Sequence, residues 1–263
     1  PRKKKLIFDG DLVREVDEVS PYLLPGSSDV VTARSKPMSA VSKMNYGNLP
    51  GDGNHLSLTL AEKNVLLASN PELEKIIIPL YGAQEFIRGM QRFCLWIDDS
   101  DLKHALSVPQ IADRIEMVRI TRSTSKDPSY NAIANRPHQY RDRNLAEHTT
   151  ILAPQVSSET REFLPTTLFK GRTGTTNQAF ALYDAPLWNM SLIASRLHLV
   201  WIATVCGKMK TDFRYSNTMG WNTFPVPVLT EKNKADLTRC AENILLVRIP
   251  ANVTGHSGDR DRF

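Results

Sequence analysis

The alternation of apolar and polar positions predicts short strands interrupted by a few helices. Strands are indicated where a short run of apolar or β-branched residues lies between Gly, Pro, Asn or Ser. The strands expected on this basis cover residues 30–33, 55–58, 76–81, 92–97, 149–154, 166–169 and 179–183. They do not alternate regularly with helices, so the expected fold class is α+β, with mixed short-stranded sheets.

Helical patterns are found in four segments. A helix over 59–68 begins at Thr59, and Glu62 three residues later completes a capping box. Residues 101–125 and 231–246 carry apolar side chains at helical spacing, which predicts amphipathic helices. The polar face of the helix predicted over 101–125 comprises Lys103, Arg114, Arg119, Arg122 and Lys126. Solvation of this basic face is favoured over contact with DNA phosphates.

Residues 187–207, LWNMSLIASRLHLVWIATVCG, predict the strongest helix of the chain. The segment is apolar on almost every side, so we expect one buried central helix here and the other helices at the periphery. Gly207 is placed to end this helix in a left-handed cap. Within it, His198 is expected to be a hydrogen-bonded core residue rather than a ligand. The polar, aperiodic residues 127–148 are expected to form a surface loop.

Composition and charge narrow the classes of protein only slightly. The chain has 263 residues, 33 basic against 28 acidic side chains and a net charge of +5. This balance is compatible with a polyanionic partner. Its three cysteines lack a C-x-x-C spacing, which predicts a reducing cytoplasm and no disulfide framework. No run of about 18 apolar residues occurs, so no membrane partner is expected.

Motifs for catalysis and for cofactor binding are missing from the sequence. It has neither a G-x-x-x-x-G-K-[ST] loop nor a G-x-S-x-G elbow, and its histidines form no metal-spaced pair. Asp98, Asp99 and Asp101 weakly suggest a magnesium nuclease, although a solvated turn before a helix is favoured. We therefore expect no catalytic residue, no metal site and no cofactor in this chain.

The stretch KMKTDFRYS, residues 208–216, places a charge on every second position. On an extended chain Lys210, Asp212 and Arg214 would share one face, with Thr211, Phe213 and Tyr215 on the other. In the major groove a lysine can donate to guanine O6 and N7 while an aspartate accepts from cytosine N4. Side chains two residues apart on a strand are separated by about 7 Å, which suits the two halves of one base pair. The alternative is an edge strand charged against aggregation.

A set of ordered motifs resembles the target recognition domain of MmeI-like restriction-modification enzymes. The resemblance covers roughly residues 16–246 and includes SPYLLPG, RSKP, GNLPGDGNHL, EKIIIPLYGAQEFIRG, RFCLWI, RIEMVR, PQVSSETREFLP, SRLH, VCG and KTDFRYS. It implies a sequence-specific double-stranded DNA recognition domain that is not catalytic by itself. The same polypeptide would contain an adenine-specific DNA methyltransferase and a nuclease, which use S-adenosylmethionine and Mg²⁺ in the cytoplasm of a prokaryote.

The resemblance also implies which residues contact DNA. Lys210 and Asp212 match a specificity pair for one outer base pair, in the version that goes with guanine, and Arg214 would hold a phosphate or orient Asp212. The remaining base-reading positions are Ser157, Ser158, Glu159, Arg161, Asp184 and Ala185. Thr160 replaces a family arginine, and Glu159 and Arg161 could instead form a structural ion pair. Contacts to the DNA backbone are expected from Arg34, Lys36 and Lys208.

The chain is divided on these grounds into four parts. Residues 1–58 lead in from the methyltransferase core, 59–229 form the recognition domain, 230–248 a C-terminal helix and 249–263 a disordered tail. Two alternatives to DNA reading stay open: a small magnesium-dependent nuclease, and a basic module that binds acidic proteins.

Overall fold

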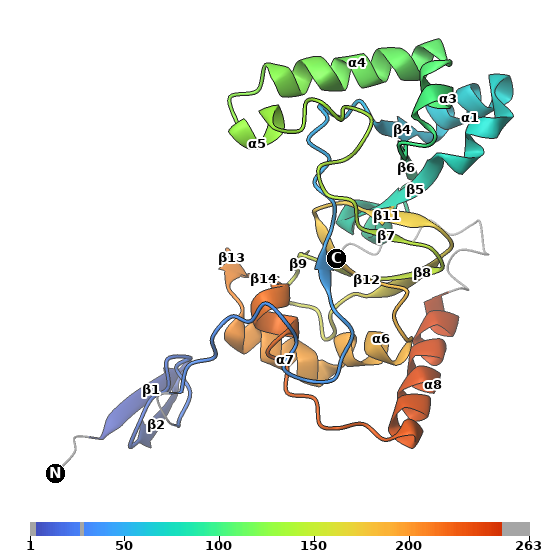
Figure 1. The fold of residues 1–263 in the computed structure, drawn as a ribbon. Coiled ribbons are helices and arrows are strands. Elements are labelled where there is room, and N and C mark those ends of the chain that lie inside the picture. The colour runs from blue at the N-terminus through green and yellow to red at the C-terminus, as the bar shows by residue number, and fades with distance from the viewer. Residues whose placement is uncertain (1–3, 27–28, 249–263) are drawn as a thin grey trace.

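The computed structural model describes residues 4–26 and 29–248, and the expected disordered tail lies outside them. Two sheets are stacked along the length of the body, each covered by its own helices (Figure 1). The fold is α+β, as the sequence predicts. No helix within the described ranges is long and apolar enough to cross a bilayer.

The upper sheet has five strands in the order β4–β6–β5–β11–β7. Only β11 and β5 pair in parallel; the other neighbours are antiparallel. The strands are β4 (Ser57–Thr59), β5 (Ile77–Tyr81), β6 (Arg92–Leu95), β7 (Leu145–Ala146) and β11 (Thr173–Thr175). The helices of this half are α1 (Leu60–Ser69), η1 (Pro71–Lys75), α2 (Ala83–Arg88), α3 (Leu102–Leu106), α4 (Pro109–Ser123) and α5 (Pro128–Asn131). Leu58, Ile78 and Ile111 belong to one continuous core between this sheet and its helices.

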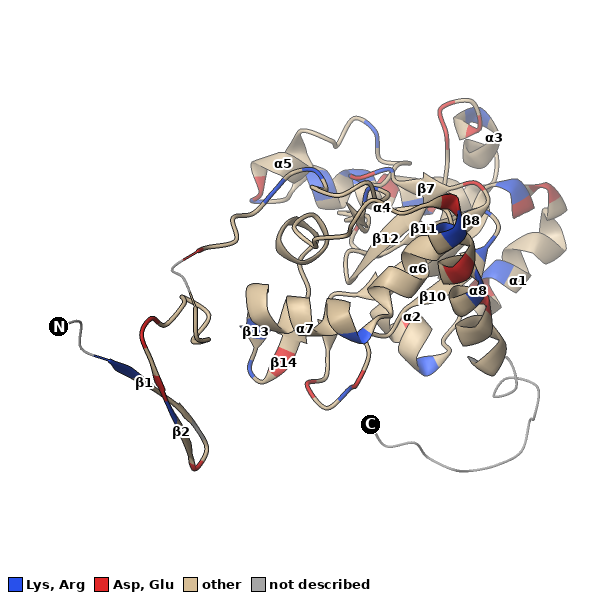
Figure 2. Cartoon of the chain, turned by 90° about the horizontal axis from the view of Figure 1, so that it is seen from below, with Lys and Arg blue, Asp and Glu red and all other residues tan. Residues whose placement is uncertain are grey.

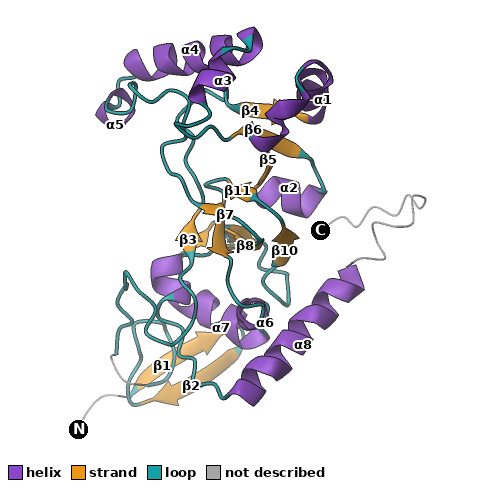
Figure 3. Ribbon diagram, turned by 45° about the vertical axis from the view of Figure 1, so that its right-hand side comes forward, coloured by secondary structure: helices purple, strands orange, loops and turns teal. Residues whose placement is uncertain are grey.

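The lower sheet has four antiparallel strands in the order β10–β8–β12–β3. These are β3 (Asn45–Tyr46), β8 (Thr149–Pro154), β10 (Thr167–Lys170) and β12 (Ala179–Tyr183). Against it pack α6 (Trp188–Ile193), α7 (Arg196–Val205) and α8 (Glu231–Arg248), with Phe180, Ile202 and Trp221 in the core (Figure 3).

Two smaller sheets complete the fold. One has three strands, β13 (Lys208–Met209), β14 (Asp212–Arg214) and β9 (Val156–Ser157), and is followed by the π-helical turn η2 (Asn217–Trp221). The other is a hairpin of β1 (Lys5–Asp9) and β2 (Leu12–Val16), which lies apart from the body at the N-terminal end (Figure 1).

The predicted central helix is two helices rather than one. Ser195 has extended backbone and accepts a hydrogen bond from the His198 N–H, which ends α6 and begins α7. Leu197 and Val200 are 70% and 56% exposed, so α7 is amphipathic and not buried all round. Gly207 does not form the left-handed cap either, because α7 ends at Cys206 in extended conformation.

Other expectations are wrong in smaller ways. The segment over 101–125 divides into α3 and α4 because Pro109 starts a new helix after the extended Val108. Residues 30–33 have no strand partner and are not a strand, and the loop over 127–148 contains α5 and β7.

The segment before β4 packs against the body of the protein and pairs with one of its sheets. The Arg34 N–H donates to Thr218 O, and β3 is an edge strand of the lower sheet. At the other end of the chain α8 packs on α6, where Ser191 Oγ donates to Leu237 O. Parts of the expected leading segment and the expected C-terminal helix therefore contribute to the folded core.

Candidate nucleic-acid interface

The charged stretch around Lys210 forms a hairpin rather than one continuous strand. Met209 pairs with Asp212, so Lys210 and Thr211 form a two-residue turn between β13 and β14. Lys210 has a φ of 59°, the positive value that such turns use. The expectation that Lys210 and Asp212 alternate along one strand is therefore wrong. They lie together instead at the tip of the hairpin, on the side of the body that faces β1 and β2 (Figure 2).

The charged side chains of this hairpin are available to a ligand. Lys210 and Arg214 are exposed and Asp212 is partly exposed. None of the three side chains forms a hydrogen bond or ion pair with another described residue. Behind them Phe213 packs on the lower core and Tyr215 is buried, as the alternating pattern predicts. Lys208 is exposed at the base, with its Nζ 5.9 Å from the centre of the Phe213 ring.

A second candidate segment joins the same sheet. Strand β9 pairs with β14, with Ser157 opposite Phe213 and Val156 opposite Arg214. Beyond the end of this strand Ser158 is partly exposed, Glu159 is exposed and Arg161 is partly exposed. Two segments that lie about fifty residues apart in the sequence thus present polar side chains side by side.

Residues 158–161, which include Ser158, Glu159 and Arg161, form a turn. Ser158 Oγ is 3.0 Å from Thr160 Oγ1, and the Arg161 N–H donates to Ser158 O. In the described chain no ion pair joins Glu159 to Arg161, which leaves both charges free toward solvent. Ser157 differs from its neighbours, because it is only 4% exposed and its hydroxyl has no partner among the described atoms.

The two expected phosphate contacts of the leading segment lie beside this sheet. The side chains of Arg34 and Lys36 are exposed, while hydrogen bonds join the backbone of this segment to η2 and to Asn222. Besides the Arg34–Thr218 bond, Asn222 Nδ2 donates to Arg34 O at 2.8 Å and the Met38 N–H donates to Asn222 O. Because η2 follows β14 after two residues, these backbone contacts place Arg34 and Lys36 near the base of the hairpin.

Asp184 and Ala185 directly follow β12, a strand of the lower sheet. Asp184 has a φ of 49°, and its carboxylate accepts the backbone N–H groups of Glu147, His148 and Thr149 at 2.8–3.0 Å. Burial acts to raise the pKa of Asp184, but these three hydrogen bonds outweigh it and the pKa is lowered. Ala185 is partly buried against the lower core. This position therefore holds a turn together and is separate from the hairpin sheet.

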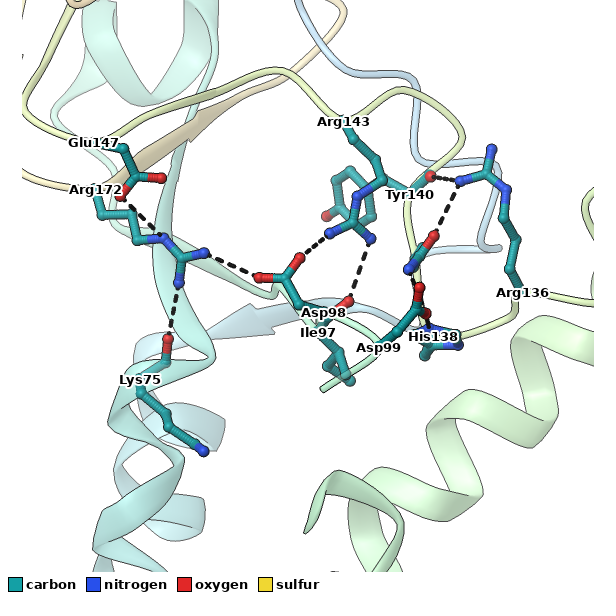
Figure 4. A network of polar contacts seen from close by, with 11 residues as sticks. Lys75, Ile97, Asp98, Asp99, Arg136, His138, Tyr140, Arg143, Glu147 and Arg172 are labelled. Carbon is teal, nitrogen blue, oxygen red and sulfur yellow. Dashed lines mark hydrogen bonds and ion pairs between the residues drawn. The ribbon is translucent and has the colours of Figure 1, made fainter. Parts of the chain in front are cut away.

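The three aspartates of the nuclease alternative each contact a different partner, and the contacts of Asp98 and Asp99 are drawn in Figure 4. Asp98 binds Arg143 and Arg172, Asp99 is 2.8 Å from His138 Nε2, and Asp101 is 2.7 Å from Lys75 Nζ. Within the described residues no three His, Cys, Asp or Glu side chains converge as a metal site would require. Asp98 and Asp101 are thus paired with basic side chains, and Asp99 contacts an imidazole nitrogen.

The prediction that His198 is a hydrogen-bonded core residue is confirmed, but sequence reasoning did not identify Tyr215 as its partner in supporting the hairpin. Tyr215 Oη lies 2.9 Å from His198 Nε2, and both side chains are within the core. Burial lowers the pKa of His198 to about 3, so the imidazole is neutral. The pattern indicates that each residue is buried, but the pairing joins α7 to the segment after β14 and has no local signal.

The small sheet thus presents charged side chains from two separate segments of the chain. The chain belongs to the family of the MmeI target recognition domain, whose family model matches residues 25–228. It is 34% identical over 244 residues to DNA methyltransferase A of Bacillus subtilis (strain 168), covering 93% of this chain and 28% of that protein.

A solved structure has the same fold. It is the type IIL restriction-modification enzyme MmeI in complex with DNA, which superimposes with a TM-score of 0.84 at 27% identity. The match covers 97% of this chain and 34% of that one. The chain thus spans about a third of the length of the relatives it matches.

Proposed function

We propose that this domain reads a specific double-stranded DNA sequence on behalf of a restriction-modification DNA methyltransferase. The observation that carries the proposal is the three-stranded sheet on which Lys210, Asp212 and Arg214 lie beside Ser158, Glu159 and Arg161. Family membership and the likeness to MmeI, solved in complex with DNA, support it.

Two kinds of contact divide the work. Arg34, Lys36 and Lys208 bind backbone phosphates and set the register of the protein on the duplex. The hairpin and the serine turn contact base edges in the major groove, which admits a two-stranded ribbon. Lys210 donates to guanine and Asp212 accepts from the paired cytosine, while Arg214 holds a phosphate or orients Asp212. Ser157 and Asp184 act by positioning the backbone, since one is buried and the carboxylate of the other is already occupied.

The parent polypeptide supplies the chemistry. We propose that its methyltransferase transfers a methyl group from S-adenosylmethionine to adenine, and that its nuclease uses Mg²⁺, both in the prokaryotic cytoplasm. Recognition places the target adenine, and flipping it out of the duplex belongs to the methyltransferase core.

Exchange of the pair at the hairpin tip tests the proposal. In the full-length protein, Lys210→Glu combined with Asp212→Arg should move the preference at one base pair from guanine to cytosine, because donor and acceptor exchange places. The change is measured by mapping methylated sites across a genome. Lys103→Glu, an equally exposed charge reversal on α3, should leave the site unaltered. Retained methylation at an unchanged site in the double variant would show that the pair does not read a base.

A further inference from the structure

The recognition hairpin is too small to hold its own position. Its strands β13 and β14 comprise two and three residues. A two-stranded ribbon of this size is marginally stable in water, so its orientation depends on what holds its base. The backbone supplies part of the attachment, since the Arg214 N–H donates to Gly207 O and the Tyr215 N–H donates to Gln155 O.

A buried side-chain pair supplies the rest. Tyr215 follows Arg214 directly in the chain and is 2% exposed. Its hydroxyl shares the 2.9 Å hydrogen bond with His198 Nε2 on α7, and His198 is 0% exposed. Both groups are neutral, and in a low-dielectric interior a hydrogen bond between them is directional and costly to leave unmade.

Close packing on several sides restricts the Tyr215 ring to one position. Phe180 of β12 meets its ring edge to face at 5.4 Å, and the His198 ring packs at 4.6 Å on Phe224. On the remaining side lies Gly220, where a Cβ would approach Tyr215 Cε2 to 2.6 Å. The ring is therefore enclosed by β12, α7 and η2, and any shift of Tyr215 is passed along the backbone of β14 to Arg214 and Asp212.

We propose that the His198–Tyr215 pair is a specificity-determining support, which fixes the hairpin at the position from which Lys210 and Asp212 read a base pair. This inference rests on the proposed function. Neither residue touches DNA; both are positioning residues. The physical reason is geometric, because a reading side chain misplaced by about 1 Å loses the bidentate geometry on which discrimination depends, whereas phosphate contacts tolerate the shift.

Tyr215→Phe in the full-length protein is the central test, since it removes the hydroxyl and keeps the ring. Methylation rates are measured on duplexes that carry the target site or a single substitution at the base pair read by the hairpin. Discrimination at that base pair should fall about tenfold, which corresponds to 1.4 kcal/mol. Affinity for unrelated duplex DNA should stay at the wild-type value.

Tyr140→Phe is the matched control. Tyr140 is also 2% exposed but lies in the core of the upper sheet, away from the hairpin. It removes an equally buried hydroxyl, one that has no hydrogen-bond partner among the described atoms, and should leave discrimination unaltered. Rates are compared well below the unfolding temperature of each variant.

A second pair of variants approaches the ring from its other side. Gly220→Ala pushes a methyl group against Tyr215, whereas Gly207→Ala meets no atom within 4 Å. Gly220→Ala should reproduce the loss of discrimination and Gly207→Ala should not. Should Tyr215→Phe fail to fold, His198→Gln tests the same bond from the helix side.

The outcomes separate the two proposals. Discrimination that stays at the wild-type level in Tyr215→Phe and Gly220→Ala, while stability falls, would overturn the positioning role and leave DNA reading intact. An equal loss at every base pair of the site would also overturn it. A wild-type protein that does not discriminate at the base pair assigned to Lys210 and Asp212 would overturn both proposals.

Discussion

Arg122 uses every N–H of its guanidinium to hold neighbouring backbone. It is 1% exposed, and its five donors reach the carbonyl oxygens of Gly51, Ile133, Arg136, Pro50 and Gln139 at 2.6–3.2 Å. The sequence places Arg122 on a basic, solvated helix face, and in this respect the prediction is wrong. A guanidinium has the planar fork that can meet several carbonyls at once, which an ammonium cannot do.

Arg122→Lys should therefore lower the free energy of unfolding by about 3 kcal/mol, because a buried charge remains while at least two carbonyls lose their donor. Chemical denaturation of the isolated domain measures this difference. Arg119→Lys, on the same helix but exposed and paired with Glu116, should change it by less than about 0.5 kcal/mol. Equal effects of the two substitutions would contradict the role of Arg122.

The buried His198 makes stability depend on pH in one direction. Its pKa is about 3 in the folded protein against 6.5 as the ordinary value, so the unfolded chain binds a proton first as pH falls. The stabilisation is complete above pH 6.5 and is lost between 6.5 and about 3, at up to about 1.4 kcal/mol per pH unit. Unfolding free energies of wild type and His198→Gln should thus converge on acidification through this window. Parallel pH profiles for the two proteins would rule out a buried neutral histidine.

At the scale of elements, one serine decides where two helices meet. The Ser195 side chain accepts from the His198 N–H at 3.1 Å and donates to Leu192 O at 2.7 Å. It therefore caps α7 while closing the end of α6, and it sets the angle at which α7 carries His198 toward Tyr215.

Loss of this cap should be measurable. Ser195→Ala is expected to destabilise the domain by about 1 kcal/mol, the usual cost of an N-cap. Thermal unfolding followed by circular dichroism gives the change. Ser123→Ala, at the exposed last turn of α4, should have a smaller effect. The Ser123 hydroxyl donates only to Arg119 O within the same helix and caps no helix start. A cost at Ser195 no larger than at Ser123 would mean that the cap is not needed.

The elements themselves were predictable where the signal is local. The Thr59–Glu62 capping box, β5, β6, β8 and β12 follow from short patterns of side chains. The break at Ser195 was missed because hydrophobicity runs through it, and a cap in the middle of an apolar run is set by backbone geometry. Residues 30–33 have strand-forming side chains but no neighbouring strand with which to pair.

For the candidate site, the sequence predicts which side chains are polar and available but not how they meet. The alternating pattern correctly places Phe213 and Tyr215 inside. The turn at Lys210 and the pairing of β14 with β9 depend on contacts between distant segments, which no local pattern encodes. The same holds for Asp184, whose carboxylate is occupied by the backbone of the preceding loop.

At the scale of the whole molecule, one extended segment connects the interface to both halves of the body. Residues 34–38 lie against η2, and β3 joins the lower sheet. Further along, the buried Asn48 Nδ2 donates to Asn144 O and Thr175 O beside the upper sheet. The segment therefore links the two halves of the body, and hydrogen bonds to Thr218 and Asn222 hold the backbone that carries Arg34 and Lys36.

This arrangement predicts how DNA affinity responds to salt. Arg34→Ala and Lys36→Ala should each reduce the slope of log affinity against log salt by about 1, and should weaken binding to all sequences alike, because phosphates carry no base information. Binding titrations of the full-length protein at several salt concentrations test this. Lys232→Ala, an exposed lysine on α8, should leave the slope unaltered. A change in sequence preference in either interface variant would show that these cations read bases.

The free side chains at the hairpin tip have a consequence for the history of such proteins. The side chains of Lys210, Asp212 and Arg214 form no hydrogen bond or ion pair with another described residue, whereas the backbone and Tyr215 attach the hairpin to the body. Substitutions of these side chains therefore cost little stability, so selection against destabilising changes does not remove them. If the hairpin reads DNA as proposed, new recognition sequences can arise by a few substitutions at its tip while the rest of the fold stays the same.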